Sequence, residues 1–411
     1  MILAENVYLE KRFKSNQNVL VLGVPGSGKS RGHVLPNLME MDSSFLILDP
    51  KGELYDISEE MLQKRGYRVD CIDFDEPLKT KSFYNPLMHI HSEEDIIKLS
   101  SLLVGGQKKY CKDPFWPDSS AILANALIGY LYTECREEDR NLGNVLNLLK
   151  QMDALAASNG RESTLDIMFE TVKKHTPNSF ALEQYELLTK CAASEKTLSS
   201  IIISLIATFS STMTKGIKYL TSKDTVNFKK MGHIKTALFV KSSDTDRSKD
   251  VLVSMLFQQA MDELCKEADS LPNHCLPVHV HLFLDDFGTN LTIDRFDALI
   301  AGMRSREISC SVVIQSEGQL RAMYGSSWST LLGSCRSYVF LGSNDLETCK
   351  AISVRMNVPL DDILYKSQDD ILVFTQGCKP QKAKRYDLRQ HLLYPQLKDF
   401  VTTNMHHATG R

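Results

Sequence analysis

The most informative segment of the chain reads Gly23-Val24-Pro25-Gly26-Ser27-Gly28-Lys29-Ser30. It follows the pattern G-x-x-x-x-G-K-S, in which glycines let backbone N–H groups curl around phosphates, a lysine meets the β and γ oxygens, and a serine hydroxyl binds Mg²⁺. An apolar run over 18–22 precedes it, and a helical pattern follows through Leu38, which is the context that the motif requires. We therefore expect an ATP and Mg²⁺ site, with nucleotide contacts from Gly23, Pro25, Gly26, Ser27, Gly28, Lys29 and Ser30.

Short apolar runs recur along the chain, each closing on Asp, Gly or Ser and followed by a helical stretch. They cover residues 19–22, 45–48, 237–240, 278–284, 311–314, 338–341 and 371–374. Near-continuous apolar strands that alternate with helices are typical of a mostly parallel sheet covered on both faces. The fold class that we expect is therefore α/β.

The middle of the chain has a different pattern, with only helical apolar periods from about residue 93 to 223. With 411 residues, the chain exceeds what one core usually organises. We expect a nucleotide-binding domain in two parts, residues 1–92 and 224–411, and an all-α insertion over residues 93–223.

Composition narrows the class of protein. The net charge of -3 gives no global attraction to nucleic acid. Ten cysteines without a CxxC pair suit free thiols in a reducing compartment. Because the longest apolar stretch is far shorter than a bilayer requires, we expect a cytoplasmic chain without a membrane anchor of its own.

A second cluster of polar residues completes the expected site. The run at 278–284 ends in Asp285-Asp286. ATP hydrolysis needs a carboxylate near Mg²⁺ and a group that orients the attacking water, so we assign Asp285 to the metal and Asp286 to the water. Gln315 ends another strand, where its amide either senses the γ-phosphate or caps the strand; its place in the sequence does not distinguish these roles.

Five further motifs occur in a fixed order: Asp49-Pro50-Lys51-Gly52-Glu53-Leu54, Tyr84-Asn85-Pro86-Leu87, Asp113-Pro114-Phe115-Trp116, Leu284-Asp285-Asp286-Phe287-Gly288 and Gln315-Ser316-Glu317-Gly318-Gln319-Leu320. Together with the phosphate-binding motif, this set resembles the TraG/TraD-type coupling proteins of type IV secretion and bacterial conjugation over nearly the whole chain.

The resemblance implies a RecA-like P-loop motor with a helical insertion, assembled as a ring of six. Such a motor uses ATP to pass DNA, with an attached relaxase or other protein, into a secretion channel at the membrane. It also implies that Asp49 lies at the nucleotide site and that a neighbouring subunit supplies an arginine finger. Arg304 matches that position, and Arg306, two residues away, is the alternative.

The chain departs from the family pattern in two ways. Relatives usually carry Asp-Glu where this chain has Asp285-Asp286, so we expect slow hydrolysis or a need for ring closure, because the Asp286 side chain is one methylene shorter. Relatives also begin with transmembrane helices, whereas the phosphate-binding motif here starts at Gly23. Two explanations for this short N-terminal segment are open: the chain is a soluble fragment, or it is a variant that a partner protein docks to the membrane.

The insertion carries two kinds of candidate contact. Phe115 and Trp116 precede a helix that we expect to begin near Asp118; we favour an anchoring role over an exposed stacking surface. Candidate phosphate contacts for single- or double-stranded DNA are Lys108, Lys109, Lys112 and the run Lys173-Lys174-His175, although solvated helix faces carry similar charges.

Two other functions remain open from the sequence. A DNA translocase of the FtsK/HerA type shares the motor but lacks the Asp-Pro-Phe-Trp motif and the long insertion. A nucleotide-gated recruitment platform would bind ATP to order the ring, hydrolyse it little and dock protein substrates on the insertion; the short side chain of Asp286 favours this alternative.

Overall fold

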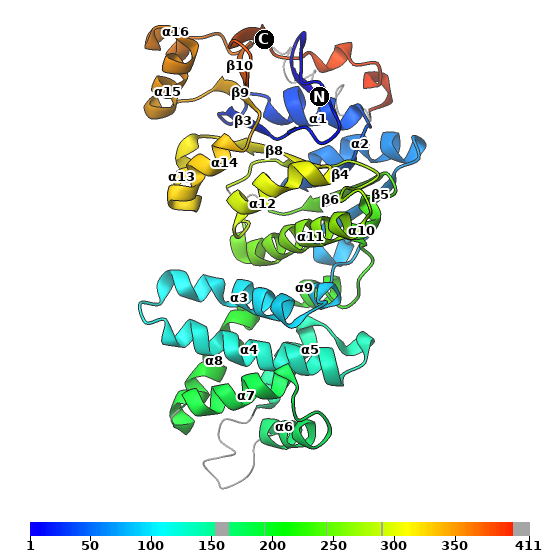
Figure 1. Ribbon diagram of the computed structural model, residues 1–411, viewed down its shortest axis with the longest axis vertical. Helices are drawn as coiled ribbons and strands as arrows, with labels where there is room; N and C mark the ends of the chain where they lie inside the picture. The colour runs from blue at the N-terminus through cyan, green and yellow to red at the C-terminus, as the bar shows by residue number, and fades with distance from the viewer. Residues whose placement is uncertain (153–163, 193, 244, 289–290, 398–411) are drawn as a thin grey trace. The chain divides into compact units, whose positions relative to one another are not determined.

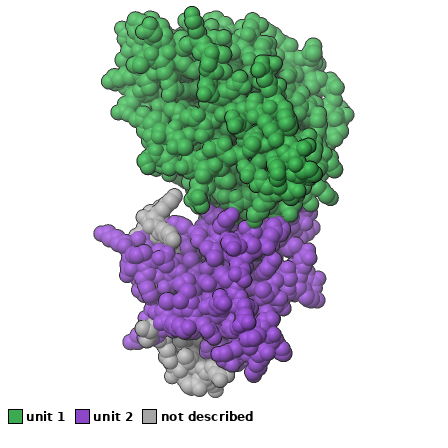
Figure 2. Space-filling model, viewed as in Figure 1, with its two compact units in different colours: residues 1–75, 227–411 green, residues 76–226 purple. Residues whose placement is uncertain are grey.

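The chain folds into two compact units. A computed structural model describes residues 1–152, 164–192, 194–243, 245–288 and 291–397. One unit combines Met1–Asp75 with Asn227–Arg411, and the other is Glu76–Val226 (Figure 2). The second unit is thus an insertion in the sequence of the first.

Within the described part of the first unit, nine strands form one sheet in the order β11-β10-β9-β3-β8-β7-β4-β6-β5. Their bounds are β3 Val19–Gly23, β4 Ser44–Asp49, β5 Arg68–Asp73, β6 Thr236–Lys241, β7 Val280–Leu284, β8 Ile308–Ile314, β9 Ser337–Gly342, β10 Asp370–Thr375 and β11 Gln381–Lys384. The strands from β9 to β5 run parallel, whereas β10 is antiparallel to β9 and β11 is antiparallel to β10. The expected mostly parallel sheet is confirmed.

Helices cover both faces of this sheet (Figure 1). A π-helical turn, Ser30–Val34, leads into α1 (Leu35–Met39), which lies on one face with α2 (Glu53–Lys64). The opposite face carries α11 (Asp250–Ser270) and α12 (Phe296–Met303). Successive side chains of a strand point to opposite faces, so β3 buries Val19 and Val21 towards α1 and its other apolar residues on the opposite side.

The remaining elements of this unit are shorter. They are β1 Ile2–Ala4, β2 Val7–Tyr8, α10 Phe228–Met231, α13 Glu317–Tyr324, α14 Trp328–Gly333, α15 Leu346–Met356 and α16 Leu360–Leu364. The pair β1-β2 forms a separate small sheet, and β5 and β11 are the two edges of the large one. Polar residues interrupt β5 and make up most of β11, which is why a search for apolar runs does not find these strands.

The described residues of the second unit form helices and no strand. These helices are α3 Glu93–Tyr110, α4 Phe115–Glu134, α5 Leu142–Gln151, α6 Thr164–His175, α7 Phe180–Cys191, α8 Glu195–Thr212 and α9 Lys215–Leu220. The α4 helix lies at the centre and packs against α3, α7 and α8. Its mean hydropathy is high and its middle is fully buried, as a central bundle helix requires.

The compact helical unit extends beyond the helical periods that mark it in the sequence. It begins at Glu76, whereas the periodicity starts at residue 93. Residues 76–92 contain two 3-10 turns, and Tyr84 donates its backbone N–H to Leu220 at the end of α9. A non-helical segment of this kind has no apolar period to reveal it. None of the described helices is both long and apolar enough to cross a membrane.

Candidate nucleotide-binding site

The phosphate-binding motif lies where β3 ends and the π-helical turn begins. β3 ends at Gly23, and the turn starts at Ser30. Lys29 is 7% exposed, and its Nζ donates to the backbone oxygens of Gly23 at 2.9 Å and Val24 at 3.4 Å. The loop thus wraps around its own lysine, with the ammonium group at the carboxyl edge of the sheet.

The loop has the features that a phosphate group requires. Gly26 adopts a φ of 77°, and a Cβ built there would meet no atom within 4 Å, so its backbone borders open space. Ser27 Oγ is buried without a hydrogen-bond partner among the described residues. Gly28 also has a positive φ, 82°, which favours glycine. These observations fit a loop whose polar groups surround phosphate oxygens.

The acidic pair lies two strands away from the loop but at the same sheet edge. Because β8 separates β3 from β7 and all three are parallel, Gly23 at the end of β3, Gln315 after β8 and Asp285 after β7 lie at the same edge of the sheet. Ser30 Oγ donates a hydrogen bond to Asp285 Oδ2. The sequence expectation that Ser30 and Asp285 come together is therefore realised in the fold.

Asp286 lies against the lysine of the loop. Its Oδ1 is 3.6 Å from Lys29 Nζ, and its backbone N–H donates to Asp285 Oδ1 at 3.1 Å. The residue has a φ of 49°, in the left-handed region that aspartate tolerates better than most residues. This backbone turn directs the two consecutive carboxylates to different neighbours, Asp285 to Ser30 and Asp286 to Lys29.

Two carboxyl groups at this edge are strongly buried. Burial raises the pKa of Asp285 to about 6, although the hydrogen bond from Ser30 opposes the shift. Burial likewise raises the pKa of Asp49, at the end of β4, to about 7. Asp49 accepts the backbone N–H of Tyr55 at 2.9 Å, so its side chain caps the first turn of α2, and the neighbouring Asp285 contributes to its raised pKa.

This donor set fits a magnesium ion. Mg²⁺ is commonly held by one or two protein ligands together with substrate phosphates and waters. Ser30 and Asp285 supply a hydroxyl and a carboxylate that already contact each other. No group of three His, Cys, Asp or Glu residues suited to a metal occurs among the described residues.

Comparison with known proteins agrees with this geometry. Residues 4–356 match the family model described as type IV secretory system conjugative DNA transfer. The chain belongs to this family. Membership in this family makes it a coupling motor of type IV secretion. A search of curated proteins found no match to its sequence.

Several solved structures share the fold. The chain is similar to plasmid coupling protein TrwB in complex with ADP and Mg²⁺, with 16% identity, a TM-score of 0.65, and coverage of 91% of this chain and 86% of that chain. A sulphate-bound form of TrwB lacking its N-terminal segment gives a TM-score of 0.66 at 16% identity, covering 92% and 91%. VirB4 of Thermoanaerobacter pseudethanolicus gives 0.50 at 15% identity, covering 92% of each chain. These likenesses confirm the RecA-like P-loop fold with a helical domain.

The structure separates the two candidate arginine fingers. Arg306 donates to both carboxylate oxygens of Asp269 at 2.8 Å and to the Gly302 carbonyl at 2.8 Å. Arg304 is exposed and hydrogen-bonds none of the described side chains. It precedes β8, whose seven residues span roughly 20 Å, so Arg304 lies at the sheet edge opposite its own phosphate-binding loop.

Gln315 lies directly beyond β8, between the strands that carry the loop and the acidic pair. Its backbone N–H donates to Gln319 Oε1 at 2.9 Å. The strand end is therefore already capped by Gln319. Because Gln319 provides this cap, the side-chain amide of Gln315 remains the candidate for sensing the γ-phosphate.

The candidate contacts of the insertion differ in their surroundings. Phe115 and Trp116 are half-buried and pack edge to face with centroids 5.2 Å apart. They form the first turn of α4, which begins three residues earlier than expected because Pro117 fits the first turn. Lys112, Lys173, Lys174 and His175 are exposed, with Lys173 3.6 Å from Glu186, whereas the side chains of Lys108 and Lys109 lie outside the described set.

A chain of histidine and serine side chains connects the π-helical turn after the phosphate-binding loop with Glu307, which precedes β8. His33 Nε2 and His281 Nε2 each lie 2.9 Å from Ser311 Oγ, and His281 Nδ1 and His279 Nε2 each lie 2.7 Å from Ser309 Oγ. His279 Nδ1 contacts Glu307 Oε2 at 2.9 Å. Burial lowers the pKa of His33 to about 3 and that of His281 well below its ordinary value, so both stay neutral.

One residue near the loop had no signal in the sequence. Arg385 follows β11, and its Nη1 donates to the Ser27 carbonyl at 3.2 Å. The two residues are 358 positions apart. Only the antiparallel return of β10 and β11 brings Arg385 beside the loop, and β11 itself lacks an apolar run that would reveal it.

Proposed function

We propose that the chain is an ATP-hydrolysing motor that moves conjugative DNA, with an attached relaxase or another protein, into a type IV secretion channel. The observation that carries the proposal is the convergence of Lys29 and Ser30 with Asp285 and Asp286 at one sheet edge. Family membership supplies the transport process. The geometry supports the chemistry.

Lys29 neutralises the phosphates of ATP. Its ammonium group is held by two backbone oxygens and by Asp286, so its position is set by the protein itself. A positive charge fixed in advance needs little rearrangement as negative charge shifts towards the leaving oxygen. Gly23 and residues 25–28 supply the surrounding backbone, which contacts the phosphates.

Ser30 and Asp285 hold Mg²⁺, which shields the phosphate charge when it is bound. The Ser30 hydroxyl now donates to Asp285, and both oxygens would become ligands. Asp285 must be ionised for this role. Because burial raises its pKa to about 6, the carboxylate is largely charged at neutral pH, and a nearby cation favours that form further.

Asp286 orients the attacking water and accepts its proton. The water oxygen bonds to the γ-phosphorus, the bond from that phosphorus to the β-bridging oxygen breaks, and ADP and phosphate are released. In the present arrangement, Asp286 lies near Lys29, so the carboxylate must turn away from Lys29 to reach a water. Gln315 is proposed as the sensor of the γ-phosphate at the adjacent strand end.

Arg304 completes the site of a neighbouring subunit in a ring of six. Its exposure and its position at the opposite sheet edge favour action between subunits. A guanidinium there would neutralise charge on the transferred phosphoryl group. Membrane attachment through channel components, or through a segment outside this sequence, would place the ring at the cytoplasmic face of the membrane.

A recruitment platform with little hydrolysis is the second candidate. The ion pair between Asp286 and Lys29 favours it, because this pair occupies the carboxylate that hydrolysis requires. Turnover of the wild type, Asp286→Glu and Asp286→Ala distinguishes the two functions. If all three hydrolyse ATP only at background rate, the platform is the better account.

DNA-stimulated turnover tests the motor. ATP hydrolysis is measured for the wild type and Lys29→Ala with single-stranded DNA, double-stranded DNA or none, at low and high salt. The proposal expects DNA to raise wild-type turnover, salt to weaken this effect, and Lys29→Ala to abolish it. Wild-type turnover that ignores both DNA forms at every salt concentration would contradict the proposal.

A further inference from the structure

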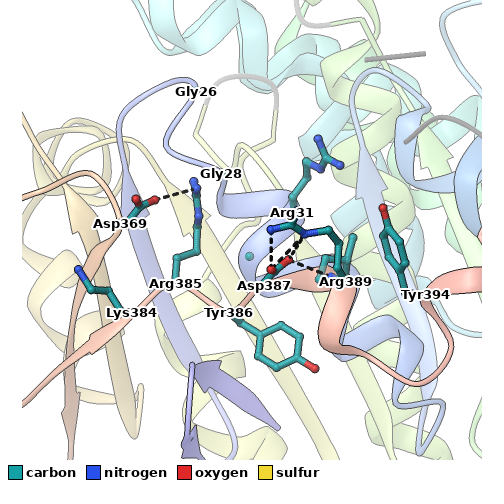
Figure 3. Close-up of a pocket in the computed structure, with 12 residues that line it drawn as sticks. Gly26, Gly28, Arg31, Asp369, Lys384, Arg385, Tyr386, Asp387, Arg389 and Tyr394 are labelled. Atoms are coloured by element: carbon teal, nitrogen blue, oxygen red, sulfur yellow. Dashed lines mark hydrogen bonds and ion pairs between the residues drawn. The ribbon is translucent and has the colours of Figure 1, made fainter. Parts of the chain in front are cut away.

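A cleft of about 580 Å³ lies beside the phosphate-binding loop. One wall consists of Gly26, Gly28 and the start of the helix that follows the loop, and the other wall consists of residues 384–389 with Tyr394 (Figure 3). Its volume falls within the range of roughly 300–1,000 Å³ that is common for small-molecule sites. All of these residues belong to the same compact unit.

We propose that this cleft holds the nucleoside of the bound nucleotide, with Arg385 on its α-phosphate and Tyr394 against its base. The inference rests on the proposed function, because the loop must hold the phosphates. Gly26 and Gly28 line the cleft and also belong to the phosphate-binding motif. A group covalently joined to phosphates in the loop can therefore extend directly into the cleft.

Arg385 is fixed at the junction between the loop and the cleft. Its Nη1 donates to the Ser27 carbonyl at 3.2 Å, and its Nη2 lies 3.1 Å from Asp369 Oδ1. Its backbone N–H donates to the Asp369 carbonyl at 2.8 Å. A guanidinium has five N–H donors, so donors beyond these two contacts are left for a phosphate oxygen.

Two glycines make room for this arginine. A Cβ at Gly28 would come within 2.7 Å of Arg385 Nη1, and a Cβ at Gly32 within 3.1 Å of Arg385 Cγ. The motif requires the first glycine for its backbone conformation, but nothing in the motif requires the second. The glycine at position 32 thus allows Arg385 to pack closely against the π-helical turn that follows the loop.

The far wall supplies groups suited to a nucleoside. Arg389 donates from Nε and Nη2 to both oxygens of Asp387, and this hydrogen bonding is the main cause that keeps the pKa of Asp387 below its ordinary value. The ring of Tyr394 stands at the same end of the cleft as Arg31 (Figure 3). An aromatic face can stack on a base, and an ionised carboxylate can accept ribose hydroxyl hydrogens.

This wall is not assigned by family membership. The family match ends at residue 356, whereas Asp369 and residues 384–394 follow it. The wall that we propose to contact the nucleoside is thus built around β10 and β11 and the segment after them. This segment lies outside the residues that match the family model.

Calorimetric binding of Mg²⁺ADP and of inorganic pyrophosphate tests the inference, because pyrophosphate lacks a nucleoside. In the wild type, we expect ADP to bind at least tenfold more tightly than pyrophosphate. Arg385→Ala and Tyr394→Ala should each weaken ADP at least tenfold and leave pyrophosphate within about twofold. Tyr394→Phe, which keeps the ring, should bind ADP like the wild type.

Two exposed residues provide matched controls, Arg136→Ala and Tyr365→Ala, for which both affinities should stay unchanged. Unchanged ADP binding in the two cleft variants, or equal losses for ADP and pyrophosphate, would overturn the inference. If the alanine variants do not fold, equal wild-type affinities for the two ligands overturn it instead.

Lys29→Ala separates this inference from the proposed function. Loss of both ligands in this variant supports nucleotide binding at the loop, whatever the cleft variants show. If ADP binding survives Lys29→Ala, the proposed function fails first. If Lys29→Ala loses ADP while both cleft variants keep it, the loop site stands and only the nucleoside cleft is rejected.

Discussion

Ser30 and Asp285, which are 255 positions apart in the chain, share a hydrogen bond across the ends of β3 and β7. This bond joins the two halves of the site. Because β8 lies between the two strands, the contact depends on the order of the parallel sheet. It defines the metal position in the proposed mechanism.

The Ser30–Asp285 contact leads to the first prediction. Ser30→Ala and Asp285→Asn should each reduce ATP turnover at least 100-fold, because either change removes a metal ligand. Both should also remove the magnesium dependence of ATP affinity, measured by titration with and without the ion. Ser326→Ala, on an exposed turn, is the control. Magnesium-dependent binding that survives in both variants would place the ion elsewhere.

The second prediction concerns Asp286. Asp286→Ala should lower the turnover rate by a factor of about 10² or more, because the water loses its proton acceptor. Asp286→Asn should be equally slow, although asparagine tolerates the φ of 49° as aspartate does. Asp286→Glu, with a longer reach, should equal or exceed the wild type. A fully active Asp286→Asn would rule out a role for this carboxylate in proton transfer.

Arg304 and Arg306 should behave differently on substitution. Arg304→Ala should abolish turnover without changing the urea midpoint of unfolding, since the side chain is exposed. Arg306→Ala should lower the free energy of unfolding by about 1–3 kcal/mol, because three hydrogen bonds are lost.

Mixing two inactive variants tests whether Arg304 acts between subunits. An equal mixture of Lys29→Ala and Arg304→Ala subunits should regain about a quarter of wild-type turnover, the share of interfaces that combine both intact residues. A mixture that stays inactive under conditions of exchange would show that the arginine does not serve a neighbour.

Much of this site could be predicted from the sequence. A local sequence pattern identifies each of three features: the loop at 23–30, the acidic pair Asp285-Asp286 and the seven apolar strands. The alternation of apolar strands and helices predicts the parallel sheet, and parallel strands bring their ends to one edge. The family resemblance, confirmed over residues 4–356, provided the transport function.

The rest depends on tertiary contacts without a local pattern. Arg385 reaches the loop only through the pairing of β10 with β11, whose sequence is polar. The contacts of His281 in β7 with Ser309 and Ser311 in β8 follow from the register of these two strands alone. Arg304 and Arg306 are alike in sequence, and only their tertiary contacts, above all the bonds of Arg306 to Asp269, distinguish them.

The buried carboxyl of Asp49 predicts a pH effect on stability. Its pKa is about 7 in the folded chain against an ordinary value of 3.8, so the folded state holds the proton more tightly. The resulting stabilisation is complete below pH 3.8 and is lost as the pH rises through 7. Asp49→Asn cannot ionise and should be more stable than the wild type at pH 8, by up to about 4 kcal/mol.

Thermal unfolding at pH 5 and pH 8, without nucleotide or magnesium, measures this effect. The gain of Asp49→Asn over the wild type should be less than half as large at pH 5 as at pH 8, because the wild-type carboxyl is fully protonated in both states only below its ordinary pKa of 3.8. Asp361→Asn, on the exposed face of α16, should show no such dependence. A difference between Asp49→Asn and the wild type that is the same at both pH values would contradict the assignment of the effect to this carboxyl.

The central claim is a DNA-stimulated ATPase whose sites are shared between subunits. Its most direct test is ATP turnover per subunit as a function of protein concentration, with and without DNA. The account predicts turnover that rises cooperatively with concentration, shifts to lower concentration when DNA is present, and disappears in Arg304→Ala. Turnover per subunit that stays constant across concentrations and is unaffected by DNA would contradict it.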